Sequence, residues 1–203
     1  LAPLFCLSII CLSDDSSGAL SQQPQATLTA GSVIEREIGG DEQHVYLLPL
    51  TAGQFASIVV EQSAVDAVLV LLKPDGQPLA EVNNHPQHEP ELLSLIAETD
   101  GAYQLKVSAP DPKAARASYK IRVEALRTAT PRDSQFVDAE RKFSEATQLL
   151  QRGKADSILQ AASMYVTVLK QWRELGARRY EMKTLVYLGA VYERQQKFLR
   201  FID

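Results

Sequence analysis

The spacing of hydrophobic residues along this chain changes once, near residues 128–134. Before that point hydrophobic and polar residues mostly alternate, which is the period of a β-strand with one buried face. After it, hydrophobic residues recur every three or four positions, as they do along one face of an α-helix. The pattern therefore predicts an all-β segment followed by an all-α segment, with a linker at 128–134.

Short strand signals fill the first segment, and turn residues separate them. The last two strands alternate most clearly: Tyr103 and Leu105 share one face of the first, and Tyr119 and Ile121 share one face of the second. One buried face and one wet face are typical of antiparallel sheets. We therefore predict an antiparallel β-sandwich domain over residues 28–127, with jelly-roll-like or immunoglobulin-like connections. The predicted strands are 33–38, 44–50, 55–62, 67–72, 78–82, 92–97, 102–107 and 118–125.

The second segment begins with a helix start signal. Thr130 is a suitable N-cap, Pro131 fits the first helical position, and Asp133 follows the cap at the spacing of a capping box. The first helix is expected to end near Gly153, and Asp156 is expected to cap the second helix. The hydrophobic stripes of the three helices are Phe136, Ala139, Phe143, Ala146 and Leu150; then Ile158, Ala161, Tyr165, Val168, Trp172 and Leu175; then Met182, Leu185, Leu188 and Tyr192. Because a repeat helix buries its stripe only against stacked neighbours, the third helix is expected to leave Leu185, Leu188 and Tyr192 exposed.

The third helix carries a repeat signature. Leu185, Leu188, Gly189 and Tyr192 have the spacing found in the first helix of a tetratricopeptide (TPR) repeat. Gly189 would let a neighbouring helix approach closely. Residues 135–203 are therefore predicted to form TPR-like helical hairpins, and arrays of this kind bind proteins or peptides on a concave face.

The first 21 residues resemble a secretory signal peptide. An apolar run over 1–12 is too short to span a bilayer, and Ala19-Leu20-Ser21 is a plausible cleavage site before a polar linker at 22–27. Both cysteines, Cys6 and Cys11, lie in this leader, so the mature part would contain neither a disulfide nor a thiol nucleophile. These features predict a periplasmic or secreted protein that meets the membrane only through its cleavable signal peptide.

The net charge of −4 is unevenly distributed. Residues 1–127 hold 8 Lys and Arg against 16 Asp and Glu, whereas residues 128–203 hold 13 against 9. Lys and Arg side chains on helices usually form a solvated face, so we interpret the positive charge of the helical half in that way. Because the chain has no basic run interleaved with aromatic residues, no nucleic-acid partner is expected.

The strand region resembles the bacterial pre-peptidase C-terminal β-sandwich. The resemblance lies in residues 64–69, the turn Lys73-Pro74-Asp75-Gly76, and the motif Gly101-Ala-Tyr103-Gln-Leu-Lys-Val107 after an acidic turn. Together with the helices, the chain is similar to the N-terminal part of exported bacterial proteins in which such a sandwich precedes TPR repeats. The resemblance implies that a caspase-like CHAT peptidase domain often follows. No catalytic residue of such a domain matches this chain.

Few side chains suggest a chemical site. The densest polar cluster is expected to be a solvated loop rather than a metal site, because two prolines interrupt it. Asp66 is expected to cap a turn, and His44 is expected to have no functional role. We therefore predict no catalytic, cofactor-binding or metal-binding residues. The cluster comprises Asn83, Asn84, His85, His88, Glu89 and Glu91.

Three hypotheses for function remain. The favoured one is a non-enzymatic, exported binding and scaffold module that engages a protein or peptide through its TPR-like helices. The second is an accessory region of a larger CHAT-type peptidase. The third is a carbohydrate-binding or Ca²⁺-binding sandwich, which would need a row of exposed aromatic residues or an acidic loop cluster.

Overall fold

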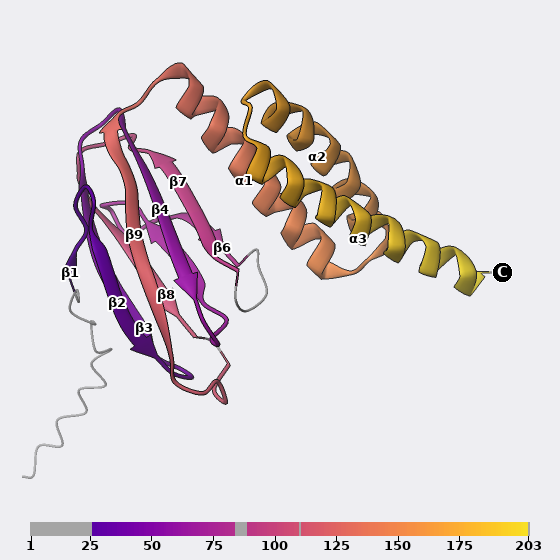
Figure 1. The fold of residues 1–203 in the computed structure, drawn as a ribbon, viewed down its shortest axis with the longest axis horizontal. Coiled ribbons are helices and arrows are strands. Elements are labelled where there is room, and N and C mark those ends of the chain that lie inside the picture. The colour runs from indigo at the N-terminus through magenta and orange to yellow at the C-terminus, as the bar shows by residue number, and fades with distance from the viewer. Residues whose placement is uncertain (1–25, 84–88, 110, 203) are drawn as a thin grey trace, which may run out of the picture.

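The computed structural model describes residues 26–83, 89–109 and 111–202, with side chains in the last helix described up to residue 196. These residues form two stacked β-sheets followed by three α-helices (Figure 1). The strands are β1 (Ala26–Thr27), β2 (Val33–Ile38), β3 (Gln43–Leu50), β4 (Gln54–Gln62), β5 (Val68–Leu72), β6 (Pro78–Val82), β7 (Glu91–Ile96), β8 (Gly101–Ser108) and β9 (Ala117–Thr128). The helices are α1 (Pro131–Arg152), α2 (Ala155–Glu174) and α3 (Arg178–Ile202).

The strands wind as a jelly roll. One sheet has the order β1-β3-β8-β5-β6 and the other β2-β9-β4-β7. The antiparallel pairs β5–β6, β4–β7, β3–β8 and β2–β9 are those of one long hairpin, rolled up so that successive pairs fall in alternate sheets. Only β1 pairs in parallel, with β3. The sequence pattern does not predict β1, because two residues are too few to show alternation.

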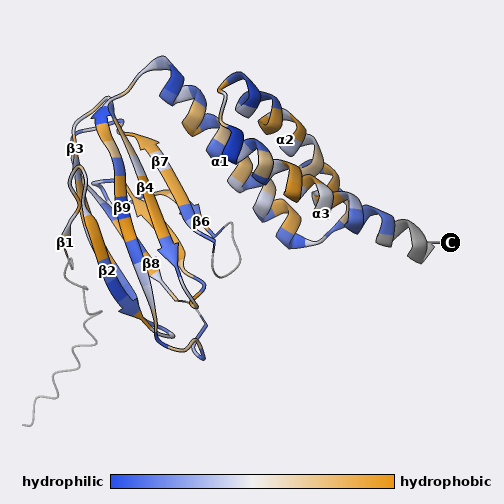
Figure 2. Ribbon diagram, in the orientation of Figure 1, coloured by the Kyte–Doolittle hydropathy of each residue, from blue (hydrophilic) through white to orange (hydrophobic). Residues whose placement is uncertain are grey.

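The core lies between the two sheets. Alternate residues of each strand point inward, and Figure 2 shows this alternation along β9 and a more continuous hydrophobic run along β4. Tyr103 and Tyr119 are both buried there, as their shared faces predicted. The turn before β6 also forms as expected: the N–H of Gly76 donates to the carbonyl of Lys73 at 2.9 Å.

The junction between β9 and α1 contains only two residues. The N–H of Ala129 donates to the carbonyl of Gly53 at 2.9 Å, which fixes the chain to the sheet. Thr130 and Asp133 then form the predicted capping box. The two terminal nitrogens of the Arg127 guanidinium, Nη1 and Nη2, donate to the Asp133 carboxylate at 2.7 and 2.8 Å. These hydrogen bonds hold the pKa of Asp133 well below its usual range, and they tie the helix start to the last strand.

The three helices share a second hydrophobic core, which includes Phe143, Tyr165 and Trp172. The expected faces of α1 and α2 point into it. The expected cap of α2 is wrong: α2 begins at Ala155 with Lys154 as its N-cap, and Asp156 lies within the first turn. An acidic residue there still favours the helix start through the helix dipole.

Most of the stripe predicted for α3 is exposed: Met182, Leu185 and Tyr192 are 68%, 45% and 54% exposed, which confirms the expected exposure of Leu185 and Tyr192. The expected exposure of Leu188 is wrong, because Leu188 is buried, as are Thr184 and Val191. Helical spacing fixes which residues share a face, but contact with α2 decides which face is buried. In the described structure nothing lies within 4 Å of a Cβ placed on Gly189, so no neighbouring helix approaches it. Only three helices are described, and they do not establish TPR hairpins.

Candidate binding groove

The sandwich has two adjacent sheet edges on the side that faces the helices. β6 ends one sheet and β7 ends the other, and α1 runs alongside them (Figure 1). The edge strand of a sheet presents N–H and C=O groups that its own sheet does not pair. This arrangement brings residues from three elements to one place.

A buried carboxylate on α1 binds the edge of β7. The N–H of Ser94 donates to Oε2 of Glu140 at 2.7 Å. The other oxygen of Glu140, Oε1, is buried and has no hydrogen-bond partner. The residue as a whole is 9% exposed. Glu140 therefore fixes α1 against β7 and still has one oxygen available.

Two further side chains of α1 reach backbone carbonyls near β6. The hydroxyl of Ser144 donates to the carbonyl of Glu81 at 3.4 Å, and Nε2 of Gln151 donates to the carbonyl of Asn83 at 3.2 Å. Positions 140, 144 and 151 lie on one side of a helix that turns every 3.6 residues. One row of polar side chains on α1 thus contacts both sheet edges.

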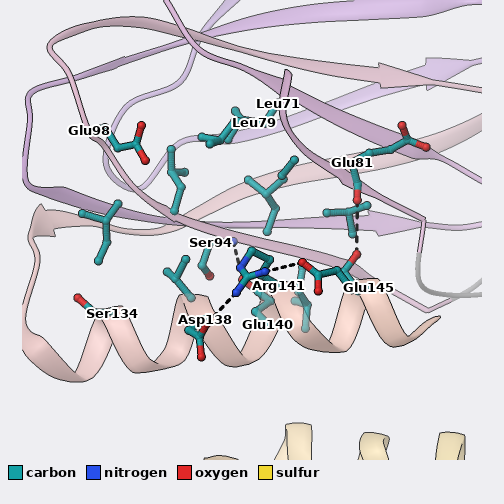
Figure 3. Close-up of a pocket in the computed structure, with 18 of the residues that line it drawn as sticks. Leu71, Leu79, Glu81, Ser94, Glu98, Ser134, Asp138, Glu140, Arg141 and Glu145 are labelled. Atoms are coloured by element: carbon teal, nitrogen blue, oxygen red, sulfur yellow. Dashed lines mark hydrogen bonds and ion pairs between the residues drawn. The ribbon is translucent and has the colours of Figure 1, made fainter. Parts of the chain in front are cut away.

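A groove of about 590 Å³ lies between these elements. Its floor is hydrophobic and is built by β5, β6, β7 and one residue of α1 (Figure 3). Hydrophobic side chains with partly exposed surface in it are Leu79, Ala80, Ile96 and Val137. The groove therefore offers apolar contact area beside exposed strand edges.

Burial changes the charge of two groups behind the groove. Desolvation raises the pKa of Glu140 to about 7, although its hydrogen bonds from Ser94 act in the opposite direction. Desolvation likewise lowers the pKa of Lys183 on α3 to about 8, while Glu89 opposes that change. Nζ of Lys183 lies 3.8 Å from Oε2 of Glu89. Near neutral pH, Glu140 is therefore only partly ionised.

The rim of the groove is mainly acidic. Five carboxyl groups and one guanidinium line it, and Figure 3 shows Asp138, Arg141 and Glu145 along α1. Burial alone would raise the pKa of Asp138, but hydrogen bonds from Lys142, Gln171 and Arg141 lower it to about 2. Arg141 bonds both Asp138 and Glu145, so it neutralises part of this charge. The remaining carboxyl groups are those of Glu81, Glu98 and Glu140.

His44 lies far from this groove, in a hydrogen-bond chain that crosses the sandwich. Its Nδ1 lies 2.6 Å from the hydroxyl of Tyr119, which also bonds the hydroxyl of Tyr46. Desolvation lowers the pKa of His44. Because Tyr119 belongs to one sheet and the other two residues to the opposite sheet, the chain links the two sheets. Its geometry indicates a structural role.

The turn cap predicted for Asp66 is supplied by another residue. Oε1 of Gln62 accepts from the N–H of Ala67 at 2.8 Å, and Nε2 of Gln62 donates to the carbonyl of Glu89 at 2.9 Å. Oδ1 of Asp66 is buried without a partner, and desolvation raises the pKa of its carboxyl group. The side chain of Gln62, and not that of Asp66, therefore caps the turn before β5.

The polar cluster around 83–91 is only partly described. His85, His88 and Asn84 lie outside the described residues. Within residues 26–83, 89–109 and 111–202, no three His, Cys, Asp or Glu side chains gather as metal ligands would. None of the helices in these ranges combines the length and hydrophobicity needed to cross a bilayer. The leader at residues 1–21 also lies outside them.

The sequence patterns do not single out the residues of the groove. Glu140, Ser144 and Gln151 recur at helical spacing, but a polar row on a helix is usually solvated. Their strand partners lie 46 to 68 positions earlier in the chain. The sequence shows that Glu140, Ser144 and Gln151 share one face of a helix. It does not show which strands lie against that face.

Comparisons with known proteins give only distant similarities. No family model and no curated protein matches the chain. Among solved structures, the pre-peptidase C-terminal domain of collagenase from Bacillus anthracis is 19% identical, with a TM-score of 0.42, over 51% of this chain and 98% of that one. PliG from Aeromonas hydrophila, a periplasmic inhibitor of g-type lysozyme, is 13% identical, with a TM-score of 0.40, over 50% of this chain and 95% of that one. PliG from Salmonella Typhimurium is 17% identical, with a TM-score of 0.37, over 50% and 97%. None of these three similarities identifies a family for this chain, and none bears on TPR repeats or a CHAT domain.

Proposed function

We propose that this chain is a non-catalytic, exported binding and scaffold module, and that the groove between β6, β7 and α1 binds a polypeptide partner. The observation that carries the proposal is the 590 Å³ groove, with its hydrophobic floor and its two strand edges. Its volume falls within the range of about 300–1,000 Å³ that is usual for ligand sites. Strand edges add backbone hydrogen bonds, which a polypeptide can complete.

The proposal assigns a role to each part of the chain. The sandwich at 28–127 carries most of the groove, and residues 128–134 connect it to TPR-like helices at 135–203 that act as the scaffold. Exposed hydrophobic residues on α3, including Met182 and Leu185, support a scaffold role because they give the helices further contact surface. The leader-like residues 1–21 support export to the periplasm or medium.

Selection from a random peptide library tests the binding site. The full chain is the bait, and each selected peptide is then measured against two variants. Val137→Trp fills the groove from α1, whereas Val166→Trp makes the same change on an exposed position of α2. We expect Val137→Trp to weaken binding at least roughly tenfold, which is ~1.4 kcal/mol, and Val166→Trp to leave it unchanged. Peptides that bind Val137→Trp as tightly as the wild type would refute the groove as the site.

A further inference from the structure

The backbone of β6 and β7 shows which peptide groups face the groove. In β7 the N–H of Ser94 points outward to Glu140, while the N–H of Ala97, just beyond the strand, donates to Gln54 of the same sheet. Backbone direction alternates along a strand, so Leu92 and Ile96 face outward with Ser94. On β6 the carbonyl of Glu81 faces outward to Ser144. The ladder with β5 changes register between Ala80 and Pro78, so alternation assigns the outward direction to Glu81 and not to Leu79.

Of the two edges, β6 is the more accessible. On β7, the N–H of the central residue Ser94 is already bound by Glu140. On β6, α1 contacts the carbonyl of Glu81 through Ser144, at 3.4 Å. Outside the ladder that joins β6 to β5, the N–H of Glu81 has no hydrogen-bond partner among the described residues. An added strand beside β6 would satisfy it.

The side chains around β6 define the chemistry of such a strand. A strand placed beside β6 would lie over α1, where Val137 offers apolar surface and Glu140 offers a buried carboxylate oxygen without a partner. Five carboxyl groups face this space, and three of them are ion-paired: Glu98 with Lys73, Asp138 with Arg141 and Lys142, and Glu145 with Arg141. Oε1 of Glu140 has no hydrogen-bond partner, although the charge of Lys183 acts on this carboxyl group. A positively charged side chain would therefore be favoured against that oxygen.

We propose that the groove binds an extended, positively charged polypeptide segment, which adds as an extra strand to β6 and places a Lys or Arg side chain against Glu140. This inference rests on the proposed function, because it names the class of partner for the same groove. Alternation of side chains along the bound strand would place apolar residues against Leu79 and Val137 and basic residues against the acidic rim.

The test uses defined peptides and the full chain. The probe is a fluorescent, blocked hexapeptide that alternates Val and Lys. The controls are its Val–Glu counterpart and a Val–Lys analogue that is N-methylated at alternate amides, which removes the donors needed for strand addition. We expect the Val–Lys peptide to bind at least roughly tenfold more tightly than either control, with an affinity that falls as salt is added.

Two measurements locate the bound peptide. Glu140→Gln should weaken binding of the Val–Lys peptide at least roughly fivefold, whereas Glu174→Gln on α2 should not change it. Hydrogen exchange should slow at the amide of Glu81 when the peptide binds, which reports strand addition even if a variant is unstable. Slowing at Leu92 and Ile96 instead, or equal binding by the Val–Glu or N-methylated peptide, would overturn the inference.

The failure of this inference can be distinguished from the failure of the proposed function. If library selection gives binders that are sensitive to Val137→Trp but the Val–Lys peptide does not bind, the inference is wrong and the binding role remains. If no selected peptide is sensitive to Val137→Trp, the groove is not the binding site and both fail.

Discussion

Replacing Glu140 by Gln should change how the stability of this protein depends on pH. Gln has nearly the shape of Glu, keeps an oxygen for the N–H of Ser94, and has no charge to lose. Burial raises the pKa of Glu140 from 4.5 to about 7. The folded state therefore binds a proton at Glu140 more tightly than the unfolded state, so the contribution of this group to stability is fully present below about pH 4.5 and is lost as pH rises to about 7.

The size of the effect follows from this difference in pKa. Each unit of pKa corresponds to ~1.4 kcal/mol, so ionisation of Glu140 costs about 3 kcal/mol of unfolding free energy above pH 7. Glu140→Gln resembles the protonated form at every pH. The variant should match the wild type near about pH 4 and exceed its stability by roughly 3 kcal/mol near about pH 8.

Urea unfolding measures this difference directly. Trp172 is fully buried in the helical core and is the only tryptophan, so its fluorescence reports unfolding of the helices that carry Glu140. Glu174→Gln is the matched control, because Glu174 is exposed on α2 and forms only a surface ion pair with Lys170. A stability difference between Glu140→Gln and the wild type that stays constant from about pH 5 to about pH 8 would show that the buried carboxyl group does not titrate as described.

Four other outcomes are expected. Tyr119→Phe removes the hydroxyl at the centre of the hydrogen-bond chain between the sheets and should cost about 1–3 kcal/mol in urea unfolding; no loss would mean that the chain does not stabilise the sandwich. Gly101→Ala places a Cβ 2.7 Å from a proline side chain at φ +145°, and it should lower thermal stability by more than ~1 kcal/mol. Gly53→Ala, where nothing lies within 4 Å, should cost less, and equal losses would contradict this account. Asp133→Ala removes the capping box and should cost about 1–2 kcal/mol above about pH 4; because the pKa of Asp133 is lowered in the fold, the difference should shrink as pH falls further. Thermal melts with Ca²⁺, Zn²⁺ or a chelator should coincide, and a metal-dependent rise in melting temperature would contradict the prediction that the chain has no metal-binding residues.

Alternation of hydrophobic residues predicts the sandwich well, because each strand is short and has one buried face. Tyr103 and Tyr119 are buried where the pattern places them, and β2 and β6 have the predicted bounds. Alternation does not choose between sandwich connections. The jelly-roll order depends on pairs such as β2–β9, which join the two ends of the strand region.

The errors arise where a distant contact overrides local pattern. Leu188 lies on the α3 stripe that is expected to be exposed, yet it is buried in the helical core with Val191. Glu140 lies beside the buried stripe of α1 and would normally be solvated, but the edge of β7 covers it. One sequence shows which side chains share a helix face, whereas the position of a sheet edge beside that face depends on the whole fold.

The two-residue junction between β9 and α1 also determines how quickly the groove would be occupied. The contacts of Arg127, Ala129 and Asp133 hold α1 in place before any ligand arrives. A groove that is already open needs no slow rearrangement, so association would be limited by diffusion and orientation, at roughly 10⁵–10⁷ M⁻¹s⁻¹. The acidic rim would raise that rate for a positively charged segment at low salt. Partners of similar charge would then differ mainly in how long they stay bound.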